Sequence, residues 1–260
     1  MFTILLVAIP IILAVTLHEV AHGWAAYMLG DNTAHKAGRL SLNPLRHVDP
    51  FGTIILPYML YSLGLPVIGF AKPVPVNFLQ LRNPRWGMVM VAIAGPAMNL
   101  LQAFIWVFLY AVAINLNMID PPQRADLLNL GGLSLFQIGV LVNCALMVFN
   151  LLPLPPLDGG RVAMGLFPAP VQQQIYAQSI KLIQKVLTVI FTVYVRFALW
   201  IKSFWGLQLP LPSESLRLSM NPIDLIGMIL LMVLLLTGML ASIIGIPIFL
   251  SVDAILSILY

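Results

Sequence analysis

Long apolar runs separated by short polar loops dominate the chain from its first residues. Three of these runs reach the roughly 20 apolar residues that a single helix needs to cross a bilayer. They predict helices over approximately residues 2–29, 86–116 and 133–152. The first is followed by a Gly-Asp-Asn turn and the third by the proline-rich segment Pro153–Pro156, both of which stop helices. The pattern therefore predicts an all-α polytopic membrane protein.

The stretch between the first two of these helices has a different pattern. Residues 51–65 are apolar but too short for a full crossing, and Pro57 and Gly64 interrupt them, which favours a re-entrant element. Residues 69–77 place valines alternately among prolines, and proline excludes a helix, so an extended strand is expected there. Residues 51–77 therefore predict a re-entrant region with a small membrane-associated β-element.

The C-terminal part predicts further helices of two kinds. Residues 171–185 are amphipathic, with glutamines and lysines on one side. Residues 186–205 are long enough to cross a membrane, although Arg196 interrupts them. A last apolar helix begins at an Asn-Pro pair and extends over approximately residues 221–250. The expected organisation is a three-helix core in residues 1–167, followed by an amphipathic segment and transmembrane helices in residues 168–260.

Composition and charge agree with a membrane protein. Hydrophobic residues make up 60% of the chain, charged residues make up 8%, and the net charge is +4. Soluble domains carry about 25% charged residues. The basic residues are not clustered, which argues against a nucleic-acid partner. The single Cys144 excludes an intramolecular disulfide and a cysteine-based zinc site. The N-terminus lacks a basic region and a cleavage site, so we expect its helix to be retained.

The distribution of lysine and arginine predicts how the chain is oriented. The loop after the first helix is basic, and so is the segment that leads into the second helix. Because basic loops favour the cytoplasmic side, both are expected there, and residues 51–65 should dip into the membrane and return. The loop at residues 117–131 and the N-terminus are then external. His18 lies about 26 Å along the first helix at 1.5 Å per residue, towards the cytoplasmic side.

The first helix carries a cluster of polar residues inside its apolar run. His18 and His22 are four residues apart, so both imidazoles project from one face of the helix. This spacing suits two zinc ligands, and the adjoining Glu19 suits a general base acting on water. The alternative is a structural histidine pair satisfied within the bundle. Ionisable groups are costly in a bilayer, however, which favours a functional role.

A third ligand is needed because catalytic zinc sites usually have three protein ligands. The remaining histidines, His35 and His47, lie in the polar loop. Asp158 follows the proline-rich end of the third helix, where irregular backbone at membrane depth indicates a buried or wet cavity. The alternative is an ordinary turn residue before two glycines. Next to the histidine pair we favour Asp158 as a ligand.

Three separated motifs make the chain resemble the site-2 protease family of intramembrane zinc metalloproteases, in a compact form without a PDZ or CBS module. They are His18-Glu19-Val20-Ala21-His22, Gly95-Pro96-Ala97-Met98-Asn99, and Asn150 to Gly160 with its Leu-Asp-Gly-Gly end. Residues 49–52 and 69–74 also resemble segments of that family. The order and spacing of three motifs are specific, whereas HExxH alone is a short pattern. The resemblance covers residues 18–160 and makes residues 1–167 the catalytic core.

The resemblance implies a role for each matching residue. His18, His22 and Asp158 would ligate one zinc ion per chain, and Glu19 would be the general base. Asn99 and Asn150 would position the substrate or polarise its carbonyl, although hydrogen bonding between helices explains an asparagine nearly as well. The expected β-element near the substrate path would pair with an extended substrate. The residues expected to contribute to that pairing are Lys72, Pro73, Val74 and Val76.

The function expected from these motifs is an intramembrane zinc metalloendopeptidase. It would hydrolyse peptide bonds within or next to transmembrane segments of membrane proteins, in the plasma (inner) membrane of a prokaryotic cell. Two alternatives remain: a metal-binding membrane protein or transporter without proteolysis, and a structural or adaptor protein. The first includes an inactive homologue, and the intact Glu19 argues against that version, since simple metal binding does not need it. The second leaves the polar cluster unexplained.

Overall fold

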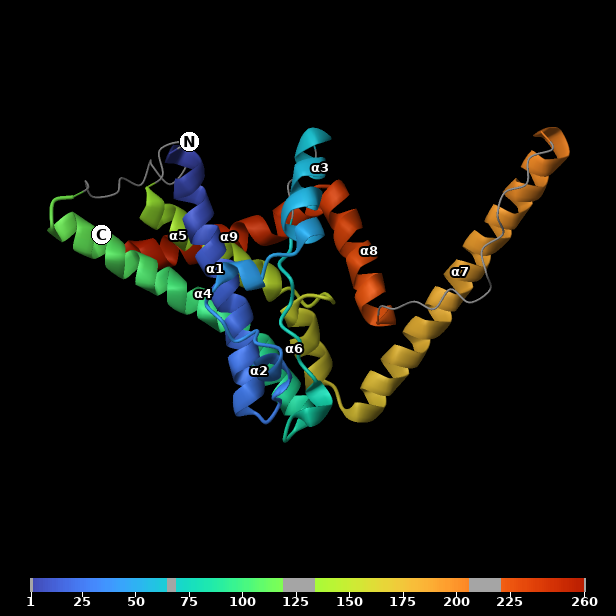
Figure 1. Ribbon diagram of the computed structural model, residues 1–260, viewed down its shortest axis with the longest axis horizontal. Coiled ribbons are helices and arrows are strands. Elements are labelled where there is room, and N and C mark those ends of the chain that lie inside the picture. The colour runs from blue at the N-terminus through green and yellow to red at the C-terminus, as the bar shows by residue number, and fades with distance from the viewer. Residues whose placement is uncertain (1, 65–68, 119–133, 206–220, 260) are drawn as a thin grey trace.

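A computed structural model describes residues 2–64, 69–118, 134–205 and 221–259 (Figure 1). Within these ranges the chain is mostly helical and contains no β-strand. The three long helices expected in the core are present as α1 (Phe2–Met28), α4 (Pro84–Asn115) and α5 (Leu135–Asn150). The side chain of Asn83 caps α4, and Ser134 forms a capping box with Gln137 at the start of α5, which explains where both begin.

Three helical stretches are long and apolar enough to cross a membrane, as judged by length and composition. They are Ala8–Met28, Pro84–Asn115 and Met239–Leu256. The helices at Leu135–Asn150 and Pro222–Leu235 are also apolar but shorter. Together with a charged content of only 8%, these helices are those of an integral membrane protein.

The segment between α1 and α4 is built from short helical pieces. Residues 51–62 belong to the π-helix η2 (Pro50–Ile55) and then to α3 (Leu56–Ser62), and the side chains of Tyr58 and Tyr61 on α3 are exposed. Apolar residues therefore face outwards from a helix too short to span a bilayer. The elements in this part are α2 (Thr33–Lys36), η1 (Pro44–Arg46), the π-helix η2 (Pro50–Ile55), α3 (Leu56–Ser62) and η3 (Phe78–Gln80).

The small β-element expected in residues 51–77 is not present as a strand. Residues 69–77 are described and are extended, but they form no β-ladder. Pro73 and Pro75 have no N–H to donate. The N–H of Lys72 donates to the carbonyl of His47 instead, and the N–H of Val74 donates to a side chain of α1. Most of the donors that a ladder would need are therefore missing or already used.

Asp31 fastens the extended segment to the end of α1. Its carboxylate accepts hydrogen bonds from the N–H and hydroxyl of Thr33 and, through its other oxygen, from the N–H of Asn77 at 2.6 Å. Burial alone would raise the pKa of Asp31, but these donors outweigh it and lower the pKa below its usual value. Residues 69–77 are thus held at a fixed place beside α1.

The C-terminal part differs from the sequence expectation in two ways. The amphipathic segment and the apolar stretch after it form one continuous helix, α7 (Ala169–Trp205), which extends away from the other helices in Figure 1. The single helix expected at residues 221–250 is two helices, α8 (Pro222–Leu236) and α9 (Met239–Leu256). They are separated at Gly238, whose φ of +73° favours glycine and ends α8. The short 3-10 helix η6 (Ser257–Leu259) follows.

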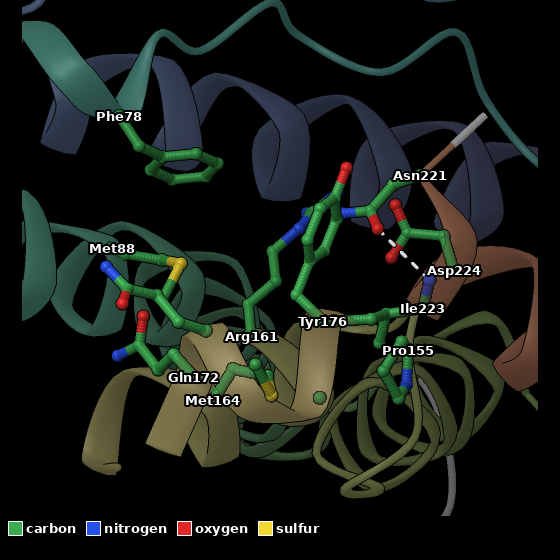
Figure 2. A pocket seen from close by; sticks show the side chains of 12 residues that line it. Phe78, Met88, Pro155, Arg161, Met164, Gln172, Tyr176, Asn221, Ile223 and Asp224 are labelled. Atoms are coloured by element: carbon green, nitrogen blue, oxygen red, sulfur yellow. Dashed lines mark hydrogen bonds between the residues drawn. The ribbon is translucent and has the colours of Figure 1, made fainter. Parts of the chain in front are cut away.

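Helix α6 (Asp158–Leu166) connects the core to this C-terminal part. A pocket of about 430 Å³ lies where α6, the start of α7 and the start of α8 meet (Figure 2). Its wall includes the polar side chains of Arg161, Gln172, Tyr176 and Asp224 together with apolar side chains such as that of Met164. The C-terminal helices therefore line a pocket with both polar and apolar walls directly beside the core.

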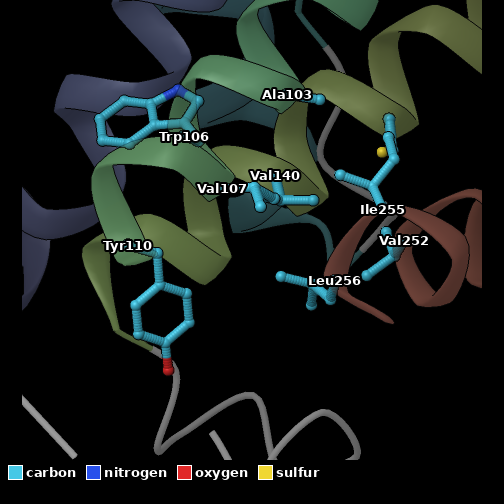
Figure 3. Packing of buried hydrophobic residues seen from close by; sticks show 9 residues of the cluster. Ala103, Trp106, Val107, Tyr110, Val140, Val252, Ile255 and Leu256 are labelled. Carbon is cyan, nitrogen blue, oxygen red and sulfur yellow. The ribbon is translucent and has the colours of Figure 1, made fainter. Parts of the chain in front are cut away.

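Helix α4 is the centre of the core and packs against α1, α5 and α6. On its far side a cluster of buried apolar residues joins α4 to α5 and α9 (Figure 3). In a membrane, close packing rather than water exclusion holds helices together, and small residues allow it. At Gly139 of α5 an added Cβ would lie 2.3 Å from the ring of Trp106. The cluster comprises Ala103, Trp106, Val107, Tyr110, Val140, Cys144, Val252, Ile255 and Leu256.

Gly139→Ala should destabilise the protein because the added methyl group overlaps the Trp106 ring and must push α5 away from α4. Overpacking of this kind costs about 1–3 kcal/mol. Thermal unfolding in detergent measures the effect. The matched control is Gly245→Ala on α9, where an added Cβ meets no atom within 4 Å. Equal unfolding temperatures for the two variants would show that the contact does not limit packing.

Candidate metal centre

The two histidines of α1 lie side by side within the bundle. His18 and His22 are each 7% exposed, and their Nε2 atoms are 3.0 Å apart. The space in front of them exists because α4 places Gly95 there. A Cβ at this position would lie 2.4 Å from Nε2 of His22. Gly95 therefore leaves a cradle around both imidazoles that any larger residue would fill.

Asp158 reaches this cradle from the opposite end of the core. It is the first residue of α6 and is 4% exposed. Its Oδ2 atom lies 3.2 Å from Nε2 of His18 and 3.2 Å from Nε2 of His22. The structure thus brings together the three residues that the sequence proposed as ligands. They are called the ligand trio below (His18, His22 and Asp158).

The hydrogen bonds behind the imidazoles determine which ring nitrogen faces the cradle. Nδ1 of His22 lies 2.7 Å from the carbonyl oxygen of Val91, and Nδ1 of His18 lies 2.5 Å from Oδ1 of Asn99. Both partner oxygens accept, so each Nδ1 carries the hydrogen and each Nε2 turns a lone pair inwards. Carboxylates and carbonyls play this part behind histidines that bind metals.

The ligand trio fits a zinc ion by its chemistry. When both imidazoles are neutral with their hydrogens on Nδ1, two Nε2 lone pairs and a carboxylate oxygen converge, and Oδ2 of Asp158 is buried without a hydrogen-bond partner among the described residues. Such atoms repel one another unless a cation lies between them. Tetrahedral ligands about 2.0–2.2 Å from zinc are roughly 3.4 Å apart. The observed separations of 3.0–3.2 Å are close to that value.

Glu19 lies on the same helix but is held by a different element. Its Oε2 accepts a hydrogen bond of 2.8 Å from the N–H of Val74, in the extended segment. Val74 stands between Pro73 and Pro75, so its N–H is the only backbone donor of those three residues. The carboxylate is half-buried, and one oxygen remains outside this bond. The extended segment therefore runs directly past the candidate base.

The two asparagines proposed from the sequence have different positions. Asn99 is fully buried, and its Oδ1 contacts Nδ1 of His18 while its Nδ2 donates to Asn143. The amide of Asn99 therefore contacts a candidate ligand and is not exposed to a substrate. Asn150 is half-buried at the end of α5, where its Nδ2 donates to the carbonyl of Leu146. Sequence reasoning missed Asn143, although a lone asparagine in an apolar helix is a recognisable signal. It also missed the Val91 carbonyl, for which no sequence signal exists.

Arg161 joins the ligand trio to the pocket of Figure 2. Its Nη1 lies 3.4 Å from Oδ1 of Asp158, and its side chain is 41% exposed. Figure 2 shows the guanidinium extending among Tyr176, Asn221 and Asp224. Arg161 therefore pairs with the carboxylate oxygen that points away from the imidazoles, which leaves the other oxygen for a metal.

Comparison with known proteins finds a family and relatives that the chain resembles. A model of the family described as Peptidase family M50 matches residues 112–194, which include Asp158. The "Putative zinc metalloprotease YwhC" of Bacillus subtilis is 41% identical over 167 residues, which are 64% of this chain and 71% of that protein. The "Putative zinc metalloprotease Rip2" of Mycolicibacterium smegmatis is 29% identical over 149 residues, 57% of this chain and 52% of that protein. No solved structure matches the chain.

The family match and the named relatives place the chain in the class of zinc metalloproteases. Within this class, the similarity to YwhC covers enough of both chains to show the family. The chain belongs to peptidase family M50.

Replacing a member of the ligand trio should remove zinc. We expect His22→Ala and Asp158→Asn each to weaken zinc binding by more than the roughly 10–100-fold that is typical of changes behind a ligand. Metal analysis of the purified protein after dialysis against a chelator measures this. Asp253→Asn makes the same carboxylate-to-amide change at an exposed position of α9 and should keep one zinc per chain. Full zinc content in Asp158→Asn would exclude Asp158 as a ligand.

Proposed function

We propose that this metalloprotease is an intramembrane endopeptidase that hydrolyses peptide bonds within or next to transmembrane segments of membrane proteins. The observation that carries the proposal is the position of the ligand trio. His18 and His22 lie within the candidate membrane span Ala8–Met28. His18 lies about 15 Å along the helix from the Met28 end of this span. A peptide bond can reach a site at that depth only if the substrate enters the bundle from the bilayer or unwinds beside it.

The site would face the cytoplasmic side of a prokaryotic plasma membrane. His18 lies nearer the Met28 end of α1 than the Phe2 end, and the loop after Met28 carries Lys36, Arg39 and Arg46. Basic loops remain in the cytoplasm, so water from that side would supply the reaction. The relatives described above are bacterial proteins. The bilayer and transmembrane proteins are then the partners of the chain.

Each residue of the site has a role in peptide hydrolysis. The ligand trio would hold one zinc ion, which as a Lewis acid activates water and polarises a peptide carbonyl. Glu19 accepts a proton from the attacking water on the oxygen that Val74 leaves unbonded, and it returns the proton to the amine that leaves. The Val74 N–H holds the other oxygen, so the carboxylate keeps one orientation through both transfers.

The asparagines divide between two tasks. Asn99 positions His18, since its side chain is buried and already bonded to the histidine and to Asn143. Asn150 is the better candidate for polarising the substrate carbonyl, because it is half-buried and its amide bonds only to Leu146 among the described residues. An asparagine N–H can stabilise developing negative charge without adding a charge to the membrane.

Glu19→Gln should abolish cleavage while zinc remains bound. An amide cannot accept the proton, and general-base catalysis contributes about 10²–10⁴-fold. Cleavage of a model transmembrane substrate reconstituted in vesicles, together with the zinc content, measures both properties. Asp253→Asn is the matched control and should cleave at the wild-type rate. Equal cleavage by wild type and Glu19→Gln would exclude the mechanism, and zinc binding without cleavage by either would favour the alternative of a metal-binding protein or transporter.

The extended segment is proposed to bind the substrate as a strand. Lys72 and Pro73 are exposed at its start, while Val74 is buried against the candidate base. The N–H of Val76 and the carbonyl of Val74 form no hydrogen bond with the rest of the described chain. An unwound substrate could pair with these groups and so lie extended beside Glu19. The β-structure expected from the sequence would then form only with substrate.

Val76→Pro tests this pairing because it removes the backbone donor, although it also alters the side chain that packs against Ala26, Leu81 and Val91. A net hydrogen bond contributes about 0.5–1.5 kcal/mol, so KM for the model substrate should rise about 2–12-fold. Val76→Ala keeps the donor and is the matched control, with an expected KM near that of wild type. If the two variants have the same KM, the N–H of Val76 does not contact the substrate. Zinc content should be unchanged in both.

A further inference from the structure

A chain of three hydrogen bonds runs from the backbone of α5 to a metal ligand of α1. Nδ2 of Asn143 donates to the carbonyl of Gly139 at 2.9 Å, and Oδ1 of Asn143 accepts from Nδ2 of Asn99 at 3.0 Å. Oδ1 of Asn99 then accepts from Nδ1 of His18 at 2.5 Å. Both asparagines are fully buried, at 0% exposure. The chain therefore crosses from α5 through α4 to α1 inside the bundle.

The direction of every bond in this chain follows from backbone carbonyls, which only accept. Asn143 must present its NH₂ group to Gly139 and its oxygen to α4. Asn99 must then present its NH₂ group to Asn143 at 3.0 Å, and the same group makes a longer contact of 3.4 Å with the carbonyl of Ala14. The oxygen of Asn99 is left for His18. Nδ1 of His18 must consequently carry the hydrogen, which leaves the lone pair of Nε2 in the cradle. A flip of either amide would place two donors or two acceptors against each other.

The residues around Asn143 prevent its amide from flipping, which would reverse the donor and acceptor direction of the hydrogen bonds. Its neighbours on α5 in the apolar cluster, Val140 and Cys144, are 0% and 1% exposed, and Figure 3 shows Val140 packed between α4 and α9. Gly139, whose carbonyl begins the chain, is packed against the ring of Trp106. Water therefore has no access with which to satisfy a flipped amide, and an unpaired buried polar group is costly.

We infer that Asn143 is a positioning residue that fixes the tautomer of His18 through Asn99 and so prepares Nε2 to bind zinc. The inference rests on the proposed role of the ligand trio. His22 obtains the same result from the backbone carbonyl of Val91, which no side-chain replacement removes. His18 is thus the ligand whose tautomer depends on side chains, and Asn143 is the residue farthest from the metal on which it depends.

The first test compares zinc affinity in two matched variants by competition with a chromogenic chelator. Asn143→Leu removes the start of the chain with a side chain of similar size and should weaken zinc binding about 10–100-fold. Asn115→Leu is the control, because Asn115 also donates to the carbonyl four residues earlier, Ala111, but lies exposed at the end of α4. Its affinity should stay within about twofold of wild type. Equal affinities for both variants would overturn the inference.

A second test separates a positioning role from a structural one. In Asn99→Asp, the carboxylate can only accept, so it holds the hydrogen on Nδ1 of His18, while its other oxygen is repelled by Oδ1 of Asn143. In that background, adding Asn143→Leu removes this repulsion and should not weaken zinc binding. If Asn143 merely stabilised the bundle, its replacement would weaken zinc binding equally in both backgrounds. Asn143→Ala replaces Asn143→Leu in this cycle if the larger side chain prevents folding.

A spectroscopic measurement reads the tautomer directly. In zinc-free protein labelled with ¹⁵N-histidine, the ring nitrogen shifts of His18 should show one form, with the hydrogen on Nδ1. In Asn143→Leu they should show a mixture of both forms, and a pure Nδ1–H form there would overturn the inference. The signal of His18 is identified by its absence from His18→Gln.

His22→Ala distinguishes failure of this inference from failure of the proposed site. If His22→Ala loses zinc while Asn143→Leu binds it as wild type does, the ligand trio stands and the role of Asn143 is wrong. If His22→Ala itself binds zinc with wild-type affinity, the metal lies elsewhere and the proposed function fails with it.

Discussion

The structure depends on the convergence of three electron-rich atoms at one point inside the bundle. The Nε2 atoms of His18 and His22 and Oδ2 of Asp158 lie 3.0–3.2 Å apart, and the hydrogen bonds behind the neutral imidazoles place their hydrogens on Nδ1, away from this point. Such a cluster is unfavourable in an apolar environment without a cation. The packing of α1, α4 and α6 therefore has to hold these atoms together against their mutual repulsion, and the zinc ion of a metalloprotease removes that repulsion.

Helix α4 provides most of this constraint. It presents Gly95 where the imidazoles need space, the carbonyl of Val91 behind His22, and Asn99 behind His18. The C-terminal half of α4 packs against α5 and α9 in the apolar cluster. A movement of α4 at the site would therefore disturb that packing. Close packing between helices replaces the water exclusion that stabilises soluble cores. Helix α4 thus contributes both to the geometry of the ligands and to the stability of the bundle.

The extended segment supplies what the helices cannot. Helical backbone has its N–H groups already bonded, whereas the Pro-Val-Pro sequence leaves the single N–H of Val74 free to hold Glu19. Asp31 fixes the far end of the segment at Asn77, and Arg39 donates to the carbonyl of Lys72. A rigid but unpaired stretch of backbone thus lies beside the base. This arrangement suits an enzyme whose substrate must become extended before its peptide bond can be cut.

The sequence alone determined the features that depend on neighbouring residues. The apolar runs predicted α1, α4 and α5, and the four-residue spacing of His18 and His22 placed both on one face, because helical periodicity is local. Asp158 was proposed as their partner through the family resemblance and the broken helix before it. The tertiary structure alone decided which polar group meets which. The partnership of Asn143, Asn99 and His18 joins residues 44 and 81 positions apart, and no local pattern encodes such distances. The predicted strand is absent from the structure for the same reason, since most donors of residues 69–77 bond to partners distant in sequence.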